Sequence, residues 1–262
     1  MALSLAGKVV FVTGGSAGIG AGCARAFAEL GARLLLLARR GERLEALAPE
    51  LRELGAADVH WVAADVRDFD AVAAAHASLP PAWQEVEVLV NNAGLSRGLD
   101  PLQDGKLEDW NEMIDTNIKG LLHVDRVFLP GMVKRGRGTV VHLGSIAGRQ
   151  AYPGGNVYCG TKYAVRGITE GLRLDLLGTG VRVVSVDPGL LRSEFGLVRF
   201  RGDASRADAV YEGMTPLTPD DVAEVVVFAA TRPPHVTLAE TLVLPTQQGS
   251  TVHVHRQRAP AV

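Results

Sequence analysis

The sequence predicts a single α/β domain, a Rossmann-type doubly wound parallel sheet of about seven strands with helices on both faces. Short apolar runs alternate with longer helical patterns along the chain, as expected where crossover helices join parallel strands. The apolar runs are nearly continuous in Val, Leu and Ile, which is typical of strands covered on both faces. No composition break or internal repeat divides the 262 residues, so we expect one domain over residues 1–262.

The individual elements follow in order from these patterns. The helix starts are marked by local signals, the clearest being Thr218 before Pro219, with Asp221 in the first turn. Strands are expected at residues 9–12, 33–37, 60–63, 86–90, 139–143, 181–186 and 241–244, and helices at 19–30, 43–54, 69–78, 109–128, 158–177 and 219–230.

The composition argues against several classes of protein. Hydrophobic residues make up 47% of the chain, its net charge is −2 and its pI is about 6.4. This balance does not favour nucleic-acid or membrane-surface binding. No signal peptide is evident, no apolar run approaches the ~20 residues of a membrane span, and the two cysteines do not suggest a disulfide framework or a metal site. We therefore expect a cytoplasmic protein.

A glycine-rich turn follows the first predicted strand. Residues 13–20 read Thr-Gly-Gly-Ser-Ala-Gly-Ile-Gly and lead into a helix. Glycine lets the backbone turn tightly and approach a ligand, and the N–H groups of a helix start attract a pyrophosphate. At the first strand–helix junction such a turn predicts dinucleotide binding. The expected cofactor residues here are Gly14, Ser16, Gly18, Ile19 and Gly20.

The end of the second strand indicates which dinucleotide binds. NAD enzymes usually carry an acid there for the ribose hydroxyls, but this chain has Ala38 followed by Arg39 and Arg40. Guanidinium groups bind a 2′-phosphate through charge-assisted hydrogen bonds, so we expect NADP. A solvated basic helix start is the alternative.

Polar residues also follow the third and fourth strands. Asp65 and Val66 come after the third, and Asn92 lies in Asn-Asn-Ala-Gly after the fourth. Open α/β sheets bind ligands at the carboxyl ends of their strands. We therefore expect Asp65 to accept from the adenine amino group and Asn92 to line the cofactor groove, unless they are ordinary turn residues.

Tyr158 and Lys162 form the most informative pair in the chain. Residues four apart share one face of a helix, so an ammonium is expected beside a phenol. A nearby positive charge lowers the pKa of a tyrosine, which is ordinarily about 10, and a tyrosine tuned in this way can exchange a proton near neutral pH. Ser145 precedes Tyr158 by thirteen residues.

Together these motifs resemble the short-chain dehydrogenase/reductase family over nearly the whole chain. The resemblance implies that Tyr158 exchanges the proton of the substrate oxygen, that Lys162 lowers its pKa and binds the nicotinamide ribose, and that Ser145 holds the substrate oxygen. It implies that Asn117 helps to hold a water beside Lys162. It also implies that the segment from Pro188 contacts the nicotinamide, through Pro188, Gly189, Leu191 and Ser193.

A narrower resemblance is to the NADP-dependent 3-hydroxy acid (serine/allo-threonine) dehydrogenase subgroup. It implies a homotetramer and a small 3-hydroxy acid substrate such as serine, allo-threonine, 3-hydroxypropionate or 3-hydroxyisobutyrate. The segments that carry it include residues 78–83, 108–117, 129–133, 154–158, 194–203 and 253–257. The chain departs from this subgroup at residues 96–97 and 149–150, and the loop after Pro188 is about one residue short.

The substrate contacts are the most open part of the prediction. An acid substrate requires a carboxylate partner, for which Arg149, Arg199 and Arg201 are candidates, and we expect substrate contacts from Ser145, Tyr158 and Arg149. The segment 189–216 is expected to act as a lid, and the tail 245–262 to contact another subunit. Two alternatives are a 3-oxoacyl-thioester or general carbonyl reductase of the same family and a catalytically silent NADP-binding sensor or scaffold.

Overall fold

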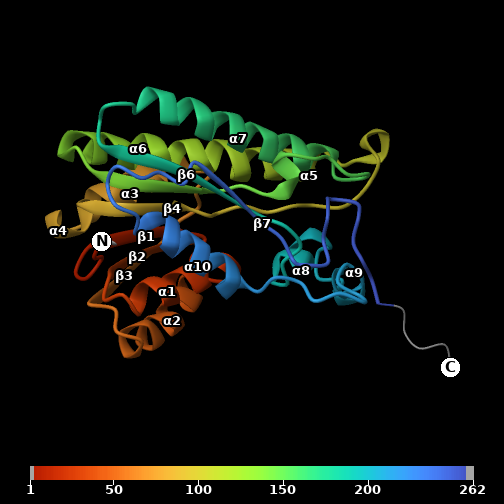
Figure 1. The fold of residues 1–262 in the computed structure, drawn as a ribbon, viewed down its shortest axis with the longest axis horizontal. Coiled ribbons are helices and arrows are strands. Elements are labelled where there is room, and N and C mark those ends of the chain that lie inside the picture. The colour runs from red at the N-terminus through yellow and green to blue at the C-terminus, as the bar shows by residue number, and fades with distance from the viewer. Residues whose placement is uncertain (1–2, 258–262) are drawn as a thin grey trace.

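Seven parallel strands form one sheet in the order β3-β2-β1-β4-β5-β6-β7 (Figure 1). The structure, a computed structural model, describes residues 3–257. The order changes direction between β1 and β4, as in a doubly wound fold, so the predicted fold class is confirmed. The strands are β1 (Val9–Thr13), β2 (Arg33–Ala38), β3 (Asp58–Ala63), β4 (Val86–Asn91), β5 (Gly138–Leu143), β6 (Val181–Pro188) and β7 (Glu240–Val243). Each predicted strand lies within two residues of these bounds.

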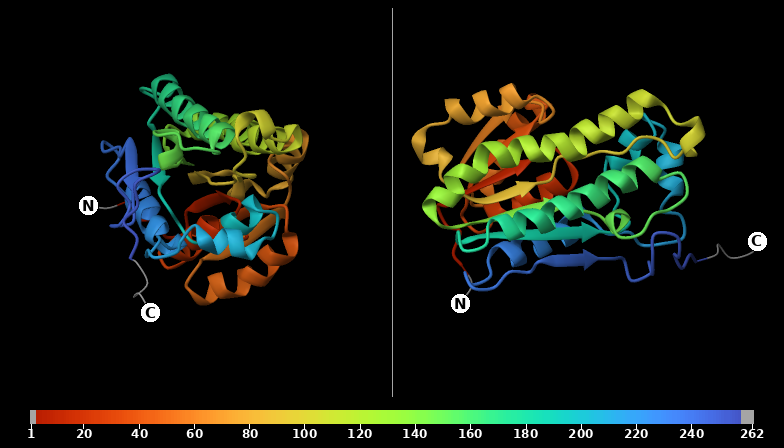
Figure 2. Two further views of the ribbon diagram at one scale, coloured as in Figure 1. Left: turned by 90° about the vertical axis from the view of Figure 1, so that its right-hand side faces the viewer. Right: turned by 90° about the horizontal axis from the view of Figure 1, so that it is seen from above.

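Helices cover both faces of the sheet (Figures 1 and 2). One face carries α1 (Gly18–Ala28), α2 (Gly41–Glu53) and α10 (Pro219–Ala230), whose apolar residues share a core with β1, β2, β4, β5 and β6. The other carries α3 (Phe69–Ser78), α6 (Leu121–Arg135) and α7 (Asn156–Asp175). The remaining helices are α4 (Pro81–Gln84), α5 (Leu107–Ile114), α8 (Phe195–Arg199) and α9 (Ala204–Ala209), with 3₁₀ turns at Leu102–Asp104 and Ile146–Gly148.

The prediction of a single helix over residues 109–128 is wrong. The chain forms α5, then a wide π-helical turn over Asp115–Gly120, then α6, which continues to Arg135. The π turn is where Thr116 and Asn117 become buried. Such turns often lie at functional sites, and this one brings Thr116 to the wall of the cavity described below and Asn117 behind it. The three short helices α4, α8 and α9 were not predicted.

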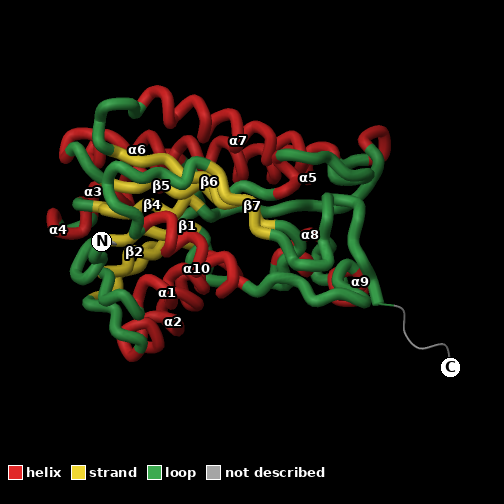
Figure 3. Tube along the Cα trace, viewed as in Figure 1, coloured by secondary structure: helices red, strands yellow, loops and turns green. Residues whose placement is uncertain are grey.

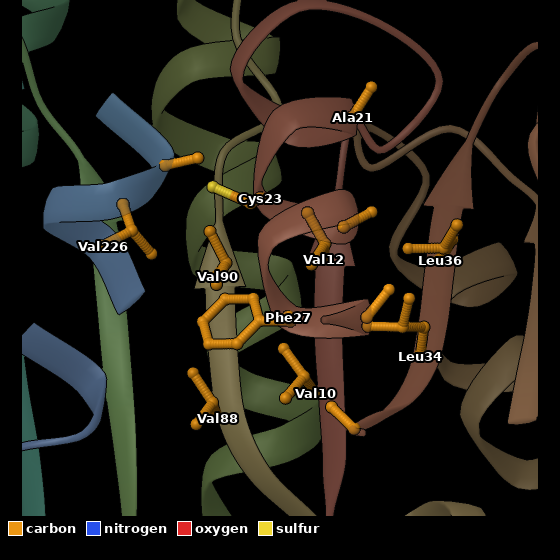
Figure 4. Close-up of a cluster of buried hydrophobic side chains, with 14 of the residues drawn as sticks. Val10, Val12, Ala21, Cys23, Phe27, Leu34, Leu36, Val88, Val90 and Val226 are labelled. Carbon is orange, nitrogen blue, oxygen red and sulfur yellow. The ribbon is translucent and has the colours of Figure 1, made fainter. Parts of the chain in front are cut away.

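The core on the α1 face is built around Phe27, which is fully buried. Figure 4 shows its ring among Val10, Val88 and Val90 from neighbouring strands, with Leu34 beside it and Val226 approaching from α10. Contacts of this kind hold α1, and therefore the glycine turn before it, in a fixed place on the sheet.

The loops that follow the strands gather at the carboxyl edge of the sheet (Figure 3). The segment 189–216, with α8 and α9, lies there, and so does the described part of the tail; residues 258–262 of the predicted tail lie outside the described residues. In the described part of the chain, no helix has the length and apolarity needed to cross a membrane.

The core predicts a specific loss of stability. Leu34 in β2 is fully buried, so replacing it with Ala removes apolar contacts and leaves a cavity, at a cost of about 3 to 5 kcal/mol of unfolding free energy. The matched control is Leu177→Ala, because Leu177 is 84% exposed and its loss should stay within about 0.5 kcal/mol. Urea unfolding measures both, and equal losses in the two variants would contradict the assigned core.

Candidate active site

A cavity of about 660 Å³ lies at the carboxyl edge of the sheet, around the point where the strand order changes direction. The loops after β1, β2, β3, β4, β5 and β6 all contribute to its walls. Most of the residues predicted to bind cofactor or substrate line it, namely Gly14, Ser16, Gly18, Ile19, Arg39, Arg40, Asp65, Val66, Asn92, Ser145, Tyr158, Lys162, Pro188, Gly189, Leu191 and Ser193. Three predicted site residues, Gly20, Asn117 and Arg149, do not line it.

The glycine turn is tied to the end of β4. The Thr13 hydroxyl accepts hydrogen bonds from the backbone N–H groups of Asn92 and Ala93, each at 3.0 Å, and the Asn92 amide donates to the Thr13 carbonyl at 2.8 Å. Gly14 adopts φ +66°, and a Cβ there would lie 2.8 Å from the Asn92 amide nitrogen. Glycine is therefore required where these two loops meet.

Gly20 has a packing role in this turn. A Cβ at Gly20 would lie 2.3 Å from the Gly14 carbonyl oxygen, so its small size allows α1 to approach the turn closely. Gly20, which was predicted to bind the cofactor, is buried in α1 and does not line the groove.

The groove fits a dinucleotide on the evidence of its own residues. The glycine-rich turn leads into the start of α1 at the groove, where helix N–H groups favour a pyrophosphate. Thr116 also lines the groove, and among the described residues its buried hydroxyl has no hydrogen-bond partner. A buried orphan hydroxyl of this kind is suited to a polar ligand atom.

The adenosine end of the groove is strongly charged. Arg39 is exposed and lines the groove, while Arg40 and Arg43 both pair with Glu194 from the segment after β6. Asp65 forms an ion pair with Arg67 at 2.6 Å, so its carboxylate already has a partner in the protein.

Lys162 lies inside the opposite end of the groove. Its Nζ donates to the Leu143 carbonyl oxygen at 2.8 Å. Burial lowers the pKa of Lys162 to about 8, although the nearby charge of Asp187 acts in the other direction. The ammonium is therefore held in a poorly hydrated position at the end of β5.

Tyr158 lies one helical turn before Lys162 on α7, and both line the groove as their spacing predicts. Burial raises the pKa of Tyr158 above its ordinary value, and the neighbouring Tyr152 adds to the rise, while Arg199 and a side-chain hydrogen bond with Ser145 lower it. Burial of the phenol therefore opposes the predicted lowering of this pKa by Lys162, whose ammonium is directed at the Leu143 carbonyl.

Asn117 acts behind the groove. Its side-chain oxygen accepts from the Leu95 N–H at 2.8 Å, and its amide donates to the Leu95 carbonyl at 2.8 Å and to Thr161 at 3.0 Å. It thus joins the loop after β4 to α7. A Cβ on Gly94 would lie 3.3 Å from the Asn117 oxygen and 3.7 Å from the Lys162 nitrogen, so both atoms lie next to Gly94.

Ser145 is held by the turn that follows β5. Its hydroxyl oxygen accepts from the Ala147 N–H at 3.0 Å, which caps a 3₁₀ turn and fixes the side chain at the groove. This hydroxyl faces the phenol of Tyr158, and its proximity counteracts part of the rise in the Tyr158 pKa.

Arg149, which was predicted to contact the substrate, does not line the groove. Its guanidinium pairs with Asp187 at 2.6 Å and Glu240 at 2.7 Å. These partners lie on β6 and β7, 38 and 91 residues further along the chain. Arg201 is likewise paired, with Asp109.

Arg199 is the arginine that lies beside Tyr158. Its Cζ is 5.2 Å from the centroid of the Tyr158 ring. The guanidinium donates to the Ser96 hydroxyl at 3.0 Å and the Tyr152 hydroxyl at 2.8 Å. Both partners are neutral, and within residues 3–257 no carboxylate forms an ion pair with Arg199. Sequence reasoning missed Tyr152, since no spacing rule marks it.

The tail also contributes to this end of the groove. The side-chain oxygen of Gln248 accepts a hydrogen bond from the Leu190 N–H at 2.7 Å. Thr251, Val252, Val254 and Arg256 line the same cavity. The polar composition of the tail gave no signal of this contact. Among the described residues, no group of three or more His, Cys, Asp or Glu side chains could hold a metal ion.

Comparison with known proteins agrees with this geometry. The family model of the short chain dehydrogenases matches residues 8–200. The chain belongs to the short-chain dehydrogenase family. A short-chain dehydrogenase is an oxidoreductase, so the cavity is the place where its redox chemistry is expected.

Several short-chain dehydrogenases are similar to this chain over most of their length. The NADP-dependent 3-hydroxy acid dehydrogenase YdfG of Salmonella typhi is 47% identical over 250 residues, which cover 95% of this chain and 99% of that protein. Sulfoacetaldehyde reductase 2 of Chromohalobacter salexigens is 47% identical over 241 residues, covering 92% and 95%. The solved closed form of serine dehydrogenase complexed with NADP+ has a TM-score of 0.90 at 42% identity and covers 95% of this chain and 100% of that chain.

Proposed function

We propose that this protein is an NADP-dependent oxidoreductase that transfers a hydride between the nicotinamide and a small 3-hydroxy acid. Serine, allo-threonine, 3-hydroxypropionate and 3-hydroxyisobutyrate are the candidate substrates. The observation that carries the acid specificity is Arg199, a cation without an acidic partner in the described chain that lies 5.2 Å from the Tyr158 ring centroid.

NADP is supported by both the chain and its relatives. Arg39 and Arg40 line the groove at the end of β2, where a guanidinium can bind a 2′-phosphate. Similar proteins are named as NADP-dependent, and one is solved with NADP+. Bound NADP would supply the hydride acceptor or donor.

The side chains around Tyr158 are proposed to handle the proton and the substrate oxygen. In oxidation, Tyr158 accepts the hydroxyl proton while Ser145 orients the oxygen through its hydroxyl. Lys162 supplies a positive charge near the phenol and binds the nicotinamide ribose. Asn117 holds α7 against the loop after β4, and so keeps Tyr158 and Lys162 positioned at the groove.

Arg199 is proposed to bind the substrate carboxylate. Its hydrogen bonds to Ser96 and Tyr152 fix the guanidinium without neutralising it. In a small 3-hydroxy acid the carboxylate carbon and the hydroxyl-bearing carbon are two bonds apart. An arginine near the phenol can therefore bind the carboxylate while Tyr158 reaches the hydroxyl. One similar protein is named sulfoacetaldehyde reductase 2, and sulfoacetaldehyde also carries an anionic group.

The remaining parts of the chain are proposed to complete the site. The segment 189–216 acts as a lid over the groove, and the tail contacts another subunit of a homotetramer as well as lining the cavity. The tetramer stays a prediction of the family resemblance, and the cytoplasmic location stays a prediction of the composition. Light scattering, which would give the mass of four chains, tests the first.

A substrate panel tests the function. With NADP+, serine, 3-hydroxypropionate and 3-hydroxyisobutyrate should each drive coenzyme reduction, and kcat/KM should fall when NAD+ replaces NADP+. Activity on an acetoacetyl thioester alone would instead favour the acyl-thioester reductase, and no turnover with any compound would favour the silent sensor. A higher kcat/KM with NAD+ would overturn the role given to Arg39 and Arg40.

Replacing Tyr158 with Phe tests the proton path. The variant should bind NADP+ with nearly unchanged affinity, because only a hydroxyl is lost, while kcat falls by about two to four powers of ten. Calorimetry measures the first and coenzyme absorbance the second. Tyr163 lies on the same helix and donates to the Arg149 carbonyl, so Tyr163→Phe is the matched control and should turn over normally. Normal turnover by Tyr158→Phe would reject the assignment.

Replacing Arg199 with Met tests the acid specificity. The loss of a charged hydrogen-bonding partner should lower kcat/KM for 3-hydroxypropionate by about 10- to 100-fold. For 1,3-propanediol, which lacks the carboxylate, the change should stay within about threefold. Arg201→Met removes the same charge from a residue that does not line the cavity and serves as the control. Equal losses for the acid and the diol would contradict the anchoring role.

A further inference from the structure

Glu194 reaches across the groove to the arginines at the end of β2. It lies just before α8, in the segment that follows β6. One carboxylate oxygen accepts from Arg40 Nη1 at 2.9 Å, and the other accepts from Arg43 Nη1 at 2.5 Å. The two arginines stand at the start of α2, more than 150 residues earlier in the chain. Sequence reasoning assigned no role to Glu194, because neither arginine is near it in sequence.

The neighbours of Glu194 place it at the coenzyme site. Ser193 lies against the glycine turn, since a Cβ on Gly18 would be 3.5 Å from the Ser193 Cβ. Arg40 also approaches the Ser16 hydroxyl at 3.5 Å. Glu194, Arg40, Ser193 and Ser16 all line the one cavity. Arg43 and Arg40 hold the pKa of Glu194 below its ordinary value, so the carboxylate is charged at neutral pH.

We propose that Glu194 is a coenzyme-selecting residue whose carboxylate competes with the 2′-phosphate of NADP for Arg40 and Arg43. This inference rests on the proposed NADP function. Carboxylate and phosphate bind a guanidinium through the same forked geometry, so both anions require the same N–H groups. A phosphate group carries close to two negative charges at neutral pH, and it cannot share these arginines with Glu194 without repulsion.

The competition acts on NADP and not on NAD. NADP must displace the carboxylate before its phosphate can take up the arginines, whereas a coenzyme without the 2′-phosphate leaves the ion pairs as they are. The side chains of Arg40 and Glu194 are 41% and 40% exposed, and half-exposed pairs of this kind are weak. The arginines therefore still favour the phosphate, and Glu194 reduces that preference by about three- to tenfold.

The contact also connects the two ends of the groove. Glu194 is followed directly by α8, which carries Phe195 and Arg199 beside Tyr158. Displacing the carboxylate would release Glu194, the residue that precedes α8, from the arginines at the start of α2. The 2′-phosphate would thereby act on the segment that holds the proposed substrate anchor.

The test is calorimetric binding of two nucleotide fragments to Glu194→Gln, which keeps the shape and removes the charge. We expect 2′,5′-ADP to bind about three- to tenfold more tightly than to the wild-type protein, and 5′-AMP to change by less than about twofold. The gain in 2′,5′-ADP affinity of Glu194→Gln over the wild-type protein should become smaller in high salt, because salt screens exposed charges. The matched control is Glu50→Gln. Glu50 does not line the cavity, and it pairs with Arg25, the side chains of Arg25 and Glu50 being 40% and 47% exposed. The affinity for both nucleotides should stay unchanged in this variant.

The outcomes separate this inference from the proposed function. Unchanged or weaker binding of 2′,5′-ADP to Glu194→Gln overturns the competition, and so does an equal gain for 5′-AMP. If wild-type protein prefers 2′,5′-ADP and Arg40→Ala loses that preference, the NADP function stands even when the Glu194 inference fails. If wild-type protein binds the two fragments equally, the NADP assignment fails and the inference falls with it.

Discussion

The buried ammonium of Lys162 is the constraint on which the site depends. Its hydrogen bond goes to the Leu143 carbonyl at the end of β5, and its position near Asp187 offsets part of the cost of burying a charge. Asp187 is in turn held by Ser185 and Arg149. Arg149, which the sequence suggested as a substrate contact, therefore contributes to the charge balance around Lys162.

The groove carries positive charge at both ends, and Tyr158 lies near one of them. Arg39 and Arg40 line the groove at the end of β2, with Arg43 next to them at the start of α2, and Arg199 lies beside Tyr158. The first set is partly neutralised by Glu194, whereas the hydrogen-bonding partners of Arg199 are neutral. This difference explains why one end suits a ligand that competes with a carboxylate, while the other suits a small free anion.

The sequence predicted the sheet and most of the groove because both depend on local patterns. Continuous apolar runs identify buried parallel strands, and the spacing of Tyr158 and Lys162 places them on one helix face. Contacts between distant residues were not predictable in this way. The π turn at Asp115–Gly120 forms where Asn117 becomes buried against α7. The pairing of Arg149 with Glu240, and the burial that raises the pKa of Tyr158, depend on parts of the chain that no spacing rule connects.

The acidity of Tyr158 tests the account most directly. Ultraviolet difference spectra, with Tyr158→Phe as the reference, give the pKa of this one phenol in the free protein and in the NADP+ complex. The account predicts a pKa above the ordinary tyrosine value in the free protein. In the complex the pKa should be at least about one unit lower, because Lys162 and the oxidised nicotinamide then both present positive charge to the phenol. An ordinary pKa in the free protein, or the same pKa in both states, would contradict it.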